Sequence, residues 1–228
     1  TIGIAGSIGL LSDSEGNAGH PRTGWTRCRY GSSRRDTLFT RMNDSDRYLF
    51  DLHGYLVLEG VVPAQLVQAC NEVLDRFEEM PDSEYPPPLC LGEERSPQSL
   101  YISNIVEGDN VFLDLMDIPA VLDAVATITG GAYRLNHTYT IYRWGGGYTG
   151  LHMHGTPLIP KAQYHFHNGE MMSTLTKVVF PMFDCGPEDG CFAVIPGAHK
   201  SNYPKPWGNH PEETPPLVAV PAKAGAAI

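Results

Sequence analysis

The stretch LTKVVFPMFDCGPEDGCFAVI, residues 175–195, reads as a strand, a turn and a second strand. Apolar and β-branched residues dominate 175–183 and 191–195, a composition typical of strands. Most of the intervening residues belong to the sequence GPEDG, which has the composition of a turn. Further strand-like segments lie at residues 133–143, 217–220 and 224–228. We therefore expect the second half of the chain to be antiparallel and rich in β-structure.

The first half of the chain is predicted to be helical. Residues 64–80 repeat apolar side chains on one helical face, and Pro63 suits the first position of such a helix. The apolar residues of that face are Leu66, Cys70, Val73, Leu74 and Phe77. The other elements expected in this half are helices at 46–52 and 118–129 and a strand at 55–58. The predicted fold class is therefore mainly β with flanking helices, an α+β arrangement.

The beginning of the chain differs from the rest. Residues 1–43 are rich in Gly, Ser, Arg and Asp and show no sustained apolar period, so a flexible leader is expected there. This leader contains several arginines, and a solvated tail is favoured over a nucleic-acid-binding one. Regular structure is expected to begin at Asp44 or Ser45, either of which suits a helix N-cap. One domain is then predicted over residues 44–228.

Composition excludes several classes of function. The formal net charge of the 228 residues is −10, and such an acidic surface repels phosphate backbones and anionic membranes. No apolar run approaches the roughly 20 residues needed to span a bilayer. The five cysteines include no CxxC pair, which disfavours a disulfide framework or a cysteine-rich zinc site. We therefore expect a cytoplasmic protein with neither nucleic acid nor membrane as a partner.

Two histidines, His152 and His154, stand in the sequence GLHMHG at residues 150–155. Residues i and i+2 of a strand point to the same face, so the two imidazoles can be directed at one point. Imidazole is a good ligand for iron, zinc or copper. The alternative is an exposed strand edge with two solvated histidines, and the spacing alone leaves both readings open.

The remaining polar residues give weaker signals. His165 and His167 repeat the i, i+2 spacing, and a structural or substrate-side role is favoured for them. His199 lies in the turn sequence PGAHK and is expected to stabilise that turn. Asp184 is expected to cap the turn that begins at Gly186. The sequence has no GxSxG elbow and no P-loop, so neither nucleophilic hydrolysis nor phosphoryl transfer is supported.

Four segments, in the same order along the chain, resemble the phytanoyl-CoA dioxygenase family. They are YLFDLHGYLVL at 48–58, LH and GTP within 151–157, YHF and NG within 164–169, and DGCFAVIPGAHK at 189–200. The resemblance implies a double-stranded β-helix with helices packed on one side. It implies iron(II) held by a His-x-Asp/Glu pair and a distal His, with 2-oxoglutarate bound to the metal. Oxygen and 2-oxoglutarate are then consumed to give succinate, carbon dioxide and a hydroxylated substrate.

The resemblance assigns roles to particular residues. His152 matches the first iron ligand. His154 stands where the family has a carboxylate, and it either supplies a further nitrogen ligand or turns away. Tyr139 and Thr176 are predicted to line the cosubstrate site, because strand parity places Tyr139 and Ile141 on one face and Thr176 on the facing strand.

The family's remaining site residues are expected beyond the end of this sequence. The distal His and the Arg that binds 2-oxoglutarate follow a strand that residues 223–228 resemble. The β-helix is therefore expected to be incomplete at its C-terminus, with unpaired strand edges. On its own, this chain is expected to bind iron weakly and to be inactive.

Three hypotheses about function remain after the sequence is read. The leading one is a non-haem iron(II)- and 2-oxoglutarate-dependent dioxygenase that, as the full-length parent, hydroxylates a small organic substrate. The second is a non-catalytic β-helix module that binds a small molecule or a partner. The third is a three-His, cupin-like metal enzyme that needs no 2-oxoglutarate and takes its third imidazole from His165 or His167.

Overall fold

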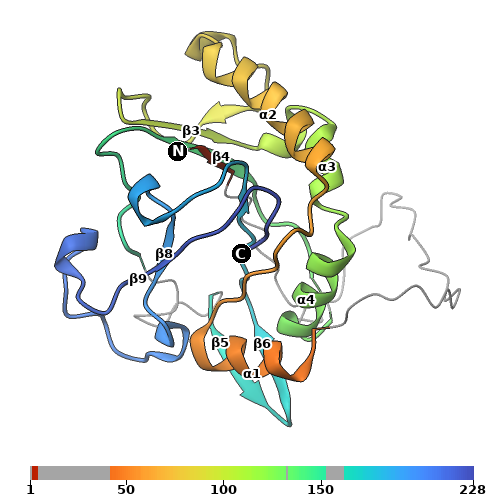
Figure 1. Cartoon of the computed structure of the whole chain (residues 1–228), viewed down its shortest axis with the longest axis vertical. Helices are drawn as coiled ribbons and strands as arrows, with labels where there is room; N and C mark the ends of the chain where they lie inside the picture. The colour runs from red at the N-terminus through yellow and green to blue at the C-terminus, as the bar shows by residue number, and fades with distance from the viewer. Residues whose placement is uncertain (1, 5–41, 132, 153–161) are drawn as a thin grey trace, which may run out of the picture.

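Helices border the molecule, and the strands lie beside them (Figure 1). The computed structural model describes residues 2–4, 42–131, 133–152 and 162–228. The α-helices of this part are α1 Asp44–His53, α2 Ala64–Glu79, α3 Val111–Leu115 and α4 Pro119–Thr129. Its short 3-10 helices are η1 Asp82–Glu84, η2 Ile105–Glu107, η3 Pro187–Asp189, η4 Ala198–Lys200 and η5 Pro211–Glu213. The helices predicted from apolar periodicity are thus confirmed to within two residues at each end.

Helix α1 begins and ends on local capping interactions. The Asn43 side chain accepts a hydrogen bond from the main-chain N–H of Asp46, and the Asp46 carboxylate accepts one from the N–H of Asn43. The N-cap is therefore Asn43, and the expectation of Asp44 or Ser45 is wrong by one or two residues. At the other end Gly54 adopts φ +82°, a left-handed conformation that glycine reaches without steric penalty.

The main sheet has the strand order β2-β3-β4-β1-β7, and every neighbouring pair in it is antiparallel. Its strands are β1 Ile2–Ile4, β2 Cys90–Leu91, β3 Ser99–Ser103, β4 Tyr139–Arg143 and β7 Phe180–Pro181. Strand β1 lies between β4 and β7, with Gly3 opposite both Ile141 and Pro181. A structured strand therefore occurs at residues 2–4, where only a flexible leader was expected.

Two separate ribbons complete the β-structure. Strand β5 (Tyr164–His167) pairs with β6 (Glu170–Ser173), and β8 (Phe192–Val194) pairs with β9 (Val218–Val220). The β5–β6 connection is Asn168-Gly169, and both residues have positive φ. This dipeptide suits the two-residue turn of a tight hairpin. Figure 1 shows the β5–β6 ribbon next to α1 and the β8–β9 ribbon on the side away from α2, α3 and α4.

The core lies between the main sheet and helices α2, α3 and α4. Leu74 on α2, Phe112 on α3, Leu100 on β3 and Tyr142 on β4 are all completely or almost completely buried. Burying each such side chain contributes about 1.5–3 kcal/mol. The Tyr142 hydroxyl donates to the main-chain carbonyl of Leu74 at 2.8 Å, so this polar group is satisfied inside the core and ties β4 to α2.

Several predicted strands are shorter in the structure or absent. Residues 175–179 and most of 55–58 and 224–228 form no named strand. The segments nevertheless meet: Leu58 and Ala227 exchange main-chain hydrogen bonds of 2.8 and 2.9 Å, and Val179 and Ile228 exchange two of 2.9 Å. The strand-like composition therefore indicated segments that meet in space, but each stretch pairs over only one or two residues.

Candidate active site

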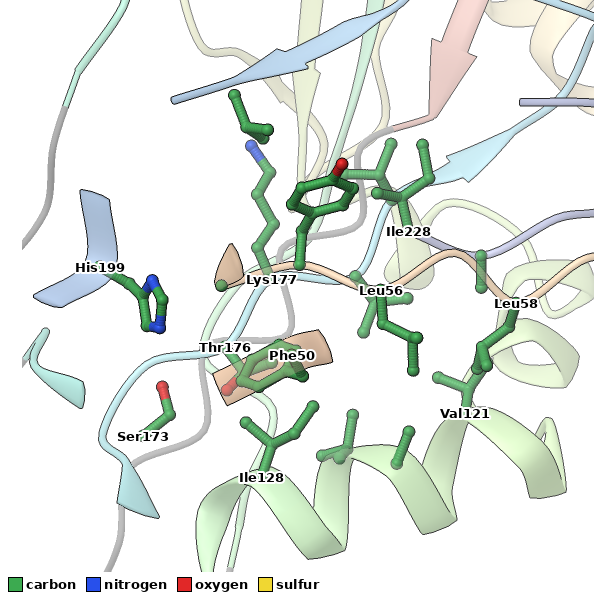
Figure 2. A pocket seen from close by; sticks show the side chains of 18 of the residues that line it. Phe50, Leu56, Leu58, Val121, Ile128, Ser173, Thr176, Lys177, His199 and Ile228 are labelled. Carbon is green, nitrogen blue, oxygen red and sulfur yellow. The ribbon is translucent and has the colours of Figure 1, made fainter. Parts of the chain in front are cut away.

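A cavity of about 230 Å³ lies where the extended segments 54–58, 173–179 and 227–228 meet helix α4. Residues of α1, β5, β8 and η4 complete its wall. Its volume is at the small end for ligand-binding sites, which suits a small molecule. Figure 2 shows Lys177, His199 and Ser173 toward one end of this cavity and Leu58, Val121 and Ile228 toward the other. The wall thus has a polar end and an apolar end.

The apolar end is built by one face of α4. Val121, Ala124, Val125 and Ile128 follow one another at three-, one- and three-residue steps, which places them on one side of the helix. All four are buried. Leu56 and Leu58 of the extended chain after α1 lie opposite this face (Figure 2). A ligand group that binds here leaves water and is surrounded by hydrocarbon side chains, so this end of the cavity favours an apolar group.

The polar end carries two groups of particular chemical interest, Thr176 and Lys177. Thr176 is buried, and its Oγ1 has no hydrogen-bond partner in the described residues. The Lys177 ammonium lies 4.8 Å from the centre of the Tyr139 ring. Burial lowers the pKa of Lys177 from 10.5 to about 8, because an apolar surrounding disfavours the charged form. Buried polar groups without partners are uncommon in proteins, so the Thr176 hydroxyl indicates a place for a ligand.

His199 closes the cavity on the side of α1. Its Nε2–H donates to the main-chain carbonyl of Asp51 at 3.1 Å, and its ring lies edge-on to Tyr164 with centroids 4.8 Å apart. Burial lowers the pKa of this imidazole, which favours the neutral form. A Cβ on Gly54 would overlap the His199 ring, so the close approach requires glycine. His199 therefore contacts α1, and the expectation that it stabilises its own turn is wrong.

Asp51 joins the same wall through its carboxylate. It accepts a hydrogen bond from the Tyr164 hydroxyl and pairs with the Lys200 ammonium at 2.9 Å. The Tyr164 hydrogen bond, with a smaller contribution from Lys200, holds the pKa of Asp51 below its usual value. The pKa of Tyr164 is raised by burial and by the Asp51 carboxylate. These contacts fix α1 against β5 and η4, and so fix the position of His199.

Two of the four predicted site residues lie near the cavity. Thr176 lines it, and Tyr139 is buried beneath the Lys177 ammonium. His152 is exposed and does not line it, while His154 lies outside the described residues. His152 Nδ1 is 2.8 Å from the Gly150 carbonyl, which only accepts hydrogen bonds, so Nδ1 is the donor in this contact. Metal-binding histidines characteristically have this arrangement.

The other predicted polar residues do not gather at the cavity. His165 and His167 are exposed on β5. Asp184 accepts from the N–H of Ala224 at 2.9 Å, whereas the turn at Gly186 is capped by Asp189. The expectation that Asp184 caps this turn is therefore wrong. Within the described residues, no three His, Cys, Asp or Glu side chains lie close enough together to hold a metal ion.

Sequence reasoning did not select Lys177 or Tyr164 for this site. Lys177 stands in the run LTKVVF, where a single charge interrupts a segment predicted to be buried. Buried lysines are rare unless they are paired, so that interruption was a usable signal. Tyr164 gave no comparable signal, because its contact with Asp51 spans 113 residues of sequence.

Comparison with known proteins agrees with this architecture. Similar solved structures include HygX from Streptomyces hygroscopicus with nickel, 2-oxoglutarate and hygromycin B bound, at 21% identity and a TM-score of 0.62; the match covers 81% of this chain and 76% of that one. HygX with iron bound matches at 20% identity and a TM-score of 0.61, covering 81% and 75%. TM-scores of this size indicate a shared fold of mixed helices and antiparallel strands.

Other comparisons concern the sequence itself. No curated protein sequence matches the chain. None of the helices within residues 42–131, 133–152 and 162–228 has the length and hydropathy that crossing a membrane requires. The model of the family described as phytanoyl-CoA dioxygenase matches residues 50–228, most of the chain. The chain therefore belongs to the phytanoyl-CoA dioxygenase family of iron(II)- and 2-oxoglutarate-dependent oxygenases, as its sequence motifs predicted.

Proposed function

We propose that the cavity is the active site of this dioxygenase and that it takes a small substrate with an apolar portion. The proposal rests on one observation: the wall of the cavity is apolar at one end and polar at the other. Val121 and Ile128 line the apolar end, while Thr176 and Lys177 line the polar end. We further propose that the frame around the cavity is the double-stranded β-helix of the family.

The residues of the polar end suit 2-oxoglutarate. This cosubstrate is a dianion, and the wall presents the half-buried Lys177 side chain and a buried Thr176 hydroxyl that has no hydrogen-bond partner within the described residues. Either group gains a hydrogen bond if a carboxylate lies against it. Thr176 and Tyr139 are proposed as residues that position the cosubstrate, as strand parity predicted.

His152, which lies outside the lining of the cavity, is proposed as an iron ligand. Its Nδ1–H is held by the Gly150 carbonyl, which fixes both the tautomer and the plane of the ring. His154 is proposed as a further ligand, which would leave the metal more positive than a carboxylate ligand does. When bound, iron and 2-oxoglutarate supply the oxidising chemistry, in which one oxygen atom enters a substrate C–H bond and the other enters succinate.

The chain's own residues orient the substrate and exclude water. The face of α4 at Val121, Val125 and Ile128 leaves no polar atom for water to bind. A substrate that binds there packs its apolar surface against α4. This packing orients the substrate so that the carbon to be hydroxylated faces the polar end of the cavity. The contacts of Asp51 and His199 keep the wall closed on the side of α1.

The test is an anaerobic titration of the protein with Fe(II) in the presence of 2-oxoglutarate. Bidentate binding of the cosubstrate to iron gives a weak visible metal-to-ligand charge-transfer band. We expect the band in the full-length protein, its loss in His152→Ala, and its retention in His167→Ala, an exposed histidine on β5. Loss in His154→Ala as well would establish a three-His site, and retention there would make His154 a bystander. A folded full-length protein without any band would refute the proposal and favour a non-catalytic binding module.

A further inference from the structure

The chain that leads to His152 has no regular secondary structure. Strand β4 ends at Arg143, and residues 144–152, here named the approach segment, form no helix or strand. His152 is the residue proposed to bind iron, and a metal ligand binds tightly only when its surroundings fix its position. Contacts outside a sheet must therefore hold the approach segment in place.

The first half of the approach segment is held by residues next to the main sheet. The N–H of Trp144 donates to the Gln98 carbonyl at 3.1 Å, and the N–H of Gly147 donates to the Trp144 carbonyl at 2.7 Å. A Cβ on Gly147 would lie 2.3 Å from the Gln98 carbonyl oxygen, so this close approach requires glycine. The Arg143 guanidinium donates to the Thr149 hydroxyl at 3.0 Å. These contacts fix the chain as far as residue 149.

The second half of the approach segment is held by residues 209 and 210, which come much later in the sequence. The N–H of Leu151 donates to the Asn209 carbonyl at 2.8 Å. The Tyr148 ring lies edge-on to the His210 ring, with centroids 4.6 Å apart and an interplanar angle of 71°. Because Leu151 adjoins His152, a displacement of residues 209 and 210 is passed directly to the proposed iron ligand.

His210 is itself fixed by the turn that follows it. It is the N-cap of η5, and its Nδ1 accepts a hydrogen bond from the N–H of Glu212 at 3.3 Å. The His210 carbonyl accepts from the N–H of Glu213 at 3.0 Å and from the buried Thr214 hydroxyl at 3.3 Å. One residue therefore caps a helix and presents its ring to Tyr148 from a defined position.

We propose that His210 is a positioning residue for the iron ligand His152. It acts through its ring contact with Tyr148 and through the adjoining hydrogen bond between Leu151 and Asn209. This inference rests on the proposed function, in which His152 binds iron. It gives a part in iron binding to a histidine that belongs to no motif of the sequence and does not line the cavity. A contact that only stabilised the fold would leave the affinity for iron unchanged when it is lost.

Anaerobic Fe(II) titration of the full-length protein with excess 2-oxoglutarate gives the Kd for iron from the charge-transfer band, without turnover. We expect Tyr148→Ala and His210→Ala each to raise this Kd on the order of 10-fold, as loss of a group that orients a metal ligand does. The double variant should raise it little further, because both changes remove the same contact. Tyr148→Phe keeps the ring and should keep the wild-type Kd. Additive losses in the double variant contradict the proposal.

His210→Asn separates positioning from capping. Asparagine is a good N-cap residue but presents no ring to Tyr148. We expect its urea midpoint to stay close to that of the wild type while its Kd for iron rises as in His210→Ala. Wild-type iron affinity in His210→Asn and Tyr148→Ala, with the band lost in His152→Ala, would refute the positioning role and leave the proposed function standing. A band that persists in His152→Ala would refute both.

Hydrogen exchange in the wild-type full-length protein tests the same coupling without a variant. If His210 positions the iron ligand, iron binding must in turn stabilise the contacts of His210, because coupling between two sites is reciprocal. We expect iron with 2-oxoglutarate to slow amide exchange severalfold in the peptide that contains η5. The matched control is η1, a 3-10 helix of the same length, where exchange should not change. Unchanged exchange at η5, or equal slowing at η1, contradicts the proposal.

Discussion

Replacing Lys177 by methionine is expected to make the folded protein more stable at neutral pH. The pKa of Lys177 falls from 10.5 in the unfolded chain to about 8 in the folded one. One pKa unit corresponds to 1.36 kcal/mol, so the buried charge costs about 3 kcal/mol at pH 7. Methionine fills a similar volume without a charge. The expected gain in the free energy of unfolding is therefore on the order of 1–3 kcal/mol, since lost packing against Tyr139 offsets part of it.

The pH dependence identifies the origin of this gain. Below pH 8 the ammonium is charged in both states and the full penalty of burial is present. Between pH 8 and 10.5 the folded protein releases the proton while the unfolded chain keeps it, so the penalty diminishes. Above pH 10.5 both states are neutral and the penalty is gone. Between pH 7 and pH 9.5 the advantage of Lys177→Met should thus shrink by about 2 kcal/mol.

Urea unfolding followed by circular dichroism at pH 7 and pH 9.5 measures this difference. Lys223→Met, which removes an exposed charge, is the matched control and should match the wild type within about 0.5 kcal/mol at both values. An advantage of Lys177→Met that is independent of pH would show that packing, not charge, is responsible. A variant less stable than the wild type at pH 7 would mean that an anion already compensates Lys177 in the folded protein.

The wall on the side of α1 gives two more predictions. Gly54→Ala should lower the free energy of unfolding by more than about 1 kcal/mol, because φ is +82° and the new methyl group would overlap His199. Gly60→Ala has a positive φ but nothing within 4 Å, so thermal denaturation of both variants separates the backbone strain from the overlap. Tyr164→Phe removes the main group that lowers the pKa of Asp51. Its destabilisation, measured by urea unfolding, should therefore be present at neutral pH and vanish as the pH falls through that lowered pKa; a loss independent of pH would contradict this.

Local signals explain why the helices were predictable. Gly54 and Gly130 both adopt left-handed conformations directly after a helix, and Pro63 directly precedes one. Each of these residues acts on its immediate neighbours, so the sequence alone locates the helix ends. Strands depend instead on partners far along the chain. The single bridge between Leu58 and Ala227 joins residues 169 positions apart, which no local pattern predicts.

Strand β1 also depends on distant partners and could not be predicted from local sequence. Ile2–Ile4 forms only three residues of strand and is followed by a segment without apolar period. Its placement depends on an open edge on β4 at Ile141 and on β7 at Pro181. Nothing in residues 2–4 indicates that edge, so composition favoured a flexible leader.

Strand parity drew attention to Thr176, which does line the cavity. The metal-binding role of the His-x-His pair and the cosubstrate role of Tyr139 stay predictions. Lys177 was not selected because a charged residue within an apolar run indicates that some group compensates the charge but does not identify that group. That question needs the three-dimensional surroundings, in which Tyr139 and an open cavity face the ammonium.

Two of the stretches that resemble the family are neighbours in space. Residues 48–58 and 189–200 are far apart in sequence, yet the N–H of Gly197 donates to the His53 carbonyl at 2.8 Å. His199 and Lys200 both bind Asp51, through its carbonyl and its carboxylate. Together, α1 and η4 therefore close one wall of the cavity. The groups proposed to recognise the cosubstrate come from the adjoining segment 173–179, so closure of the site and its chemistry reside in different parts of the chain.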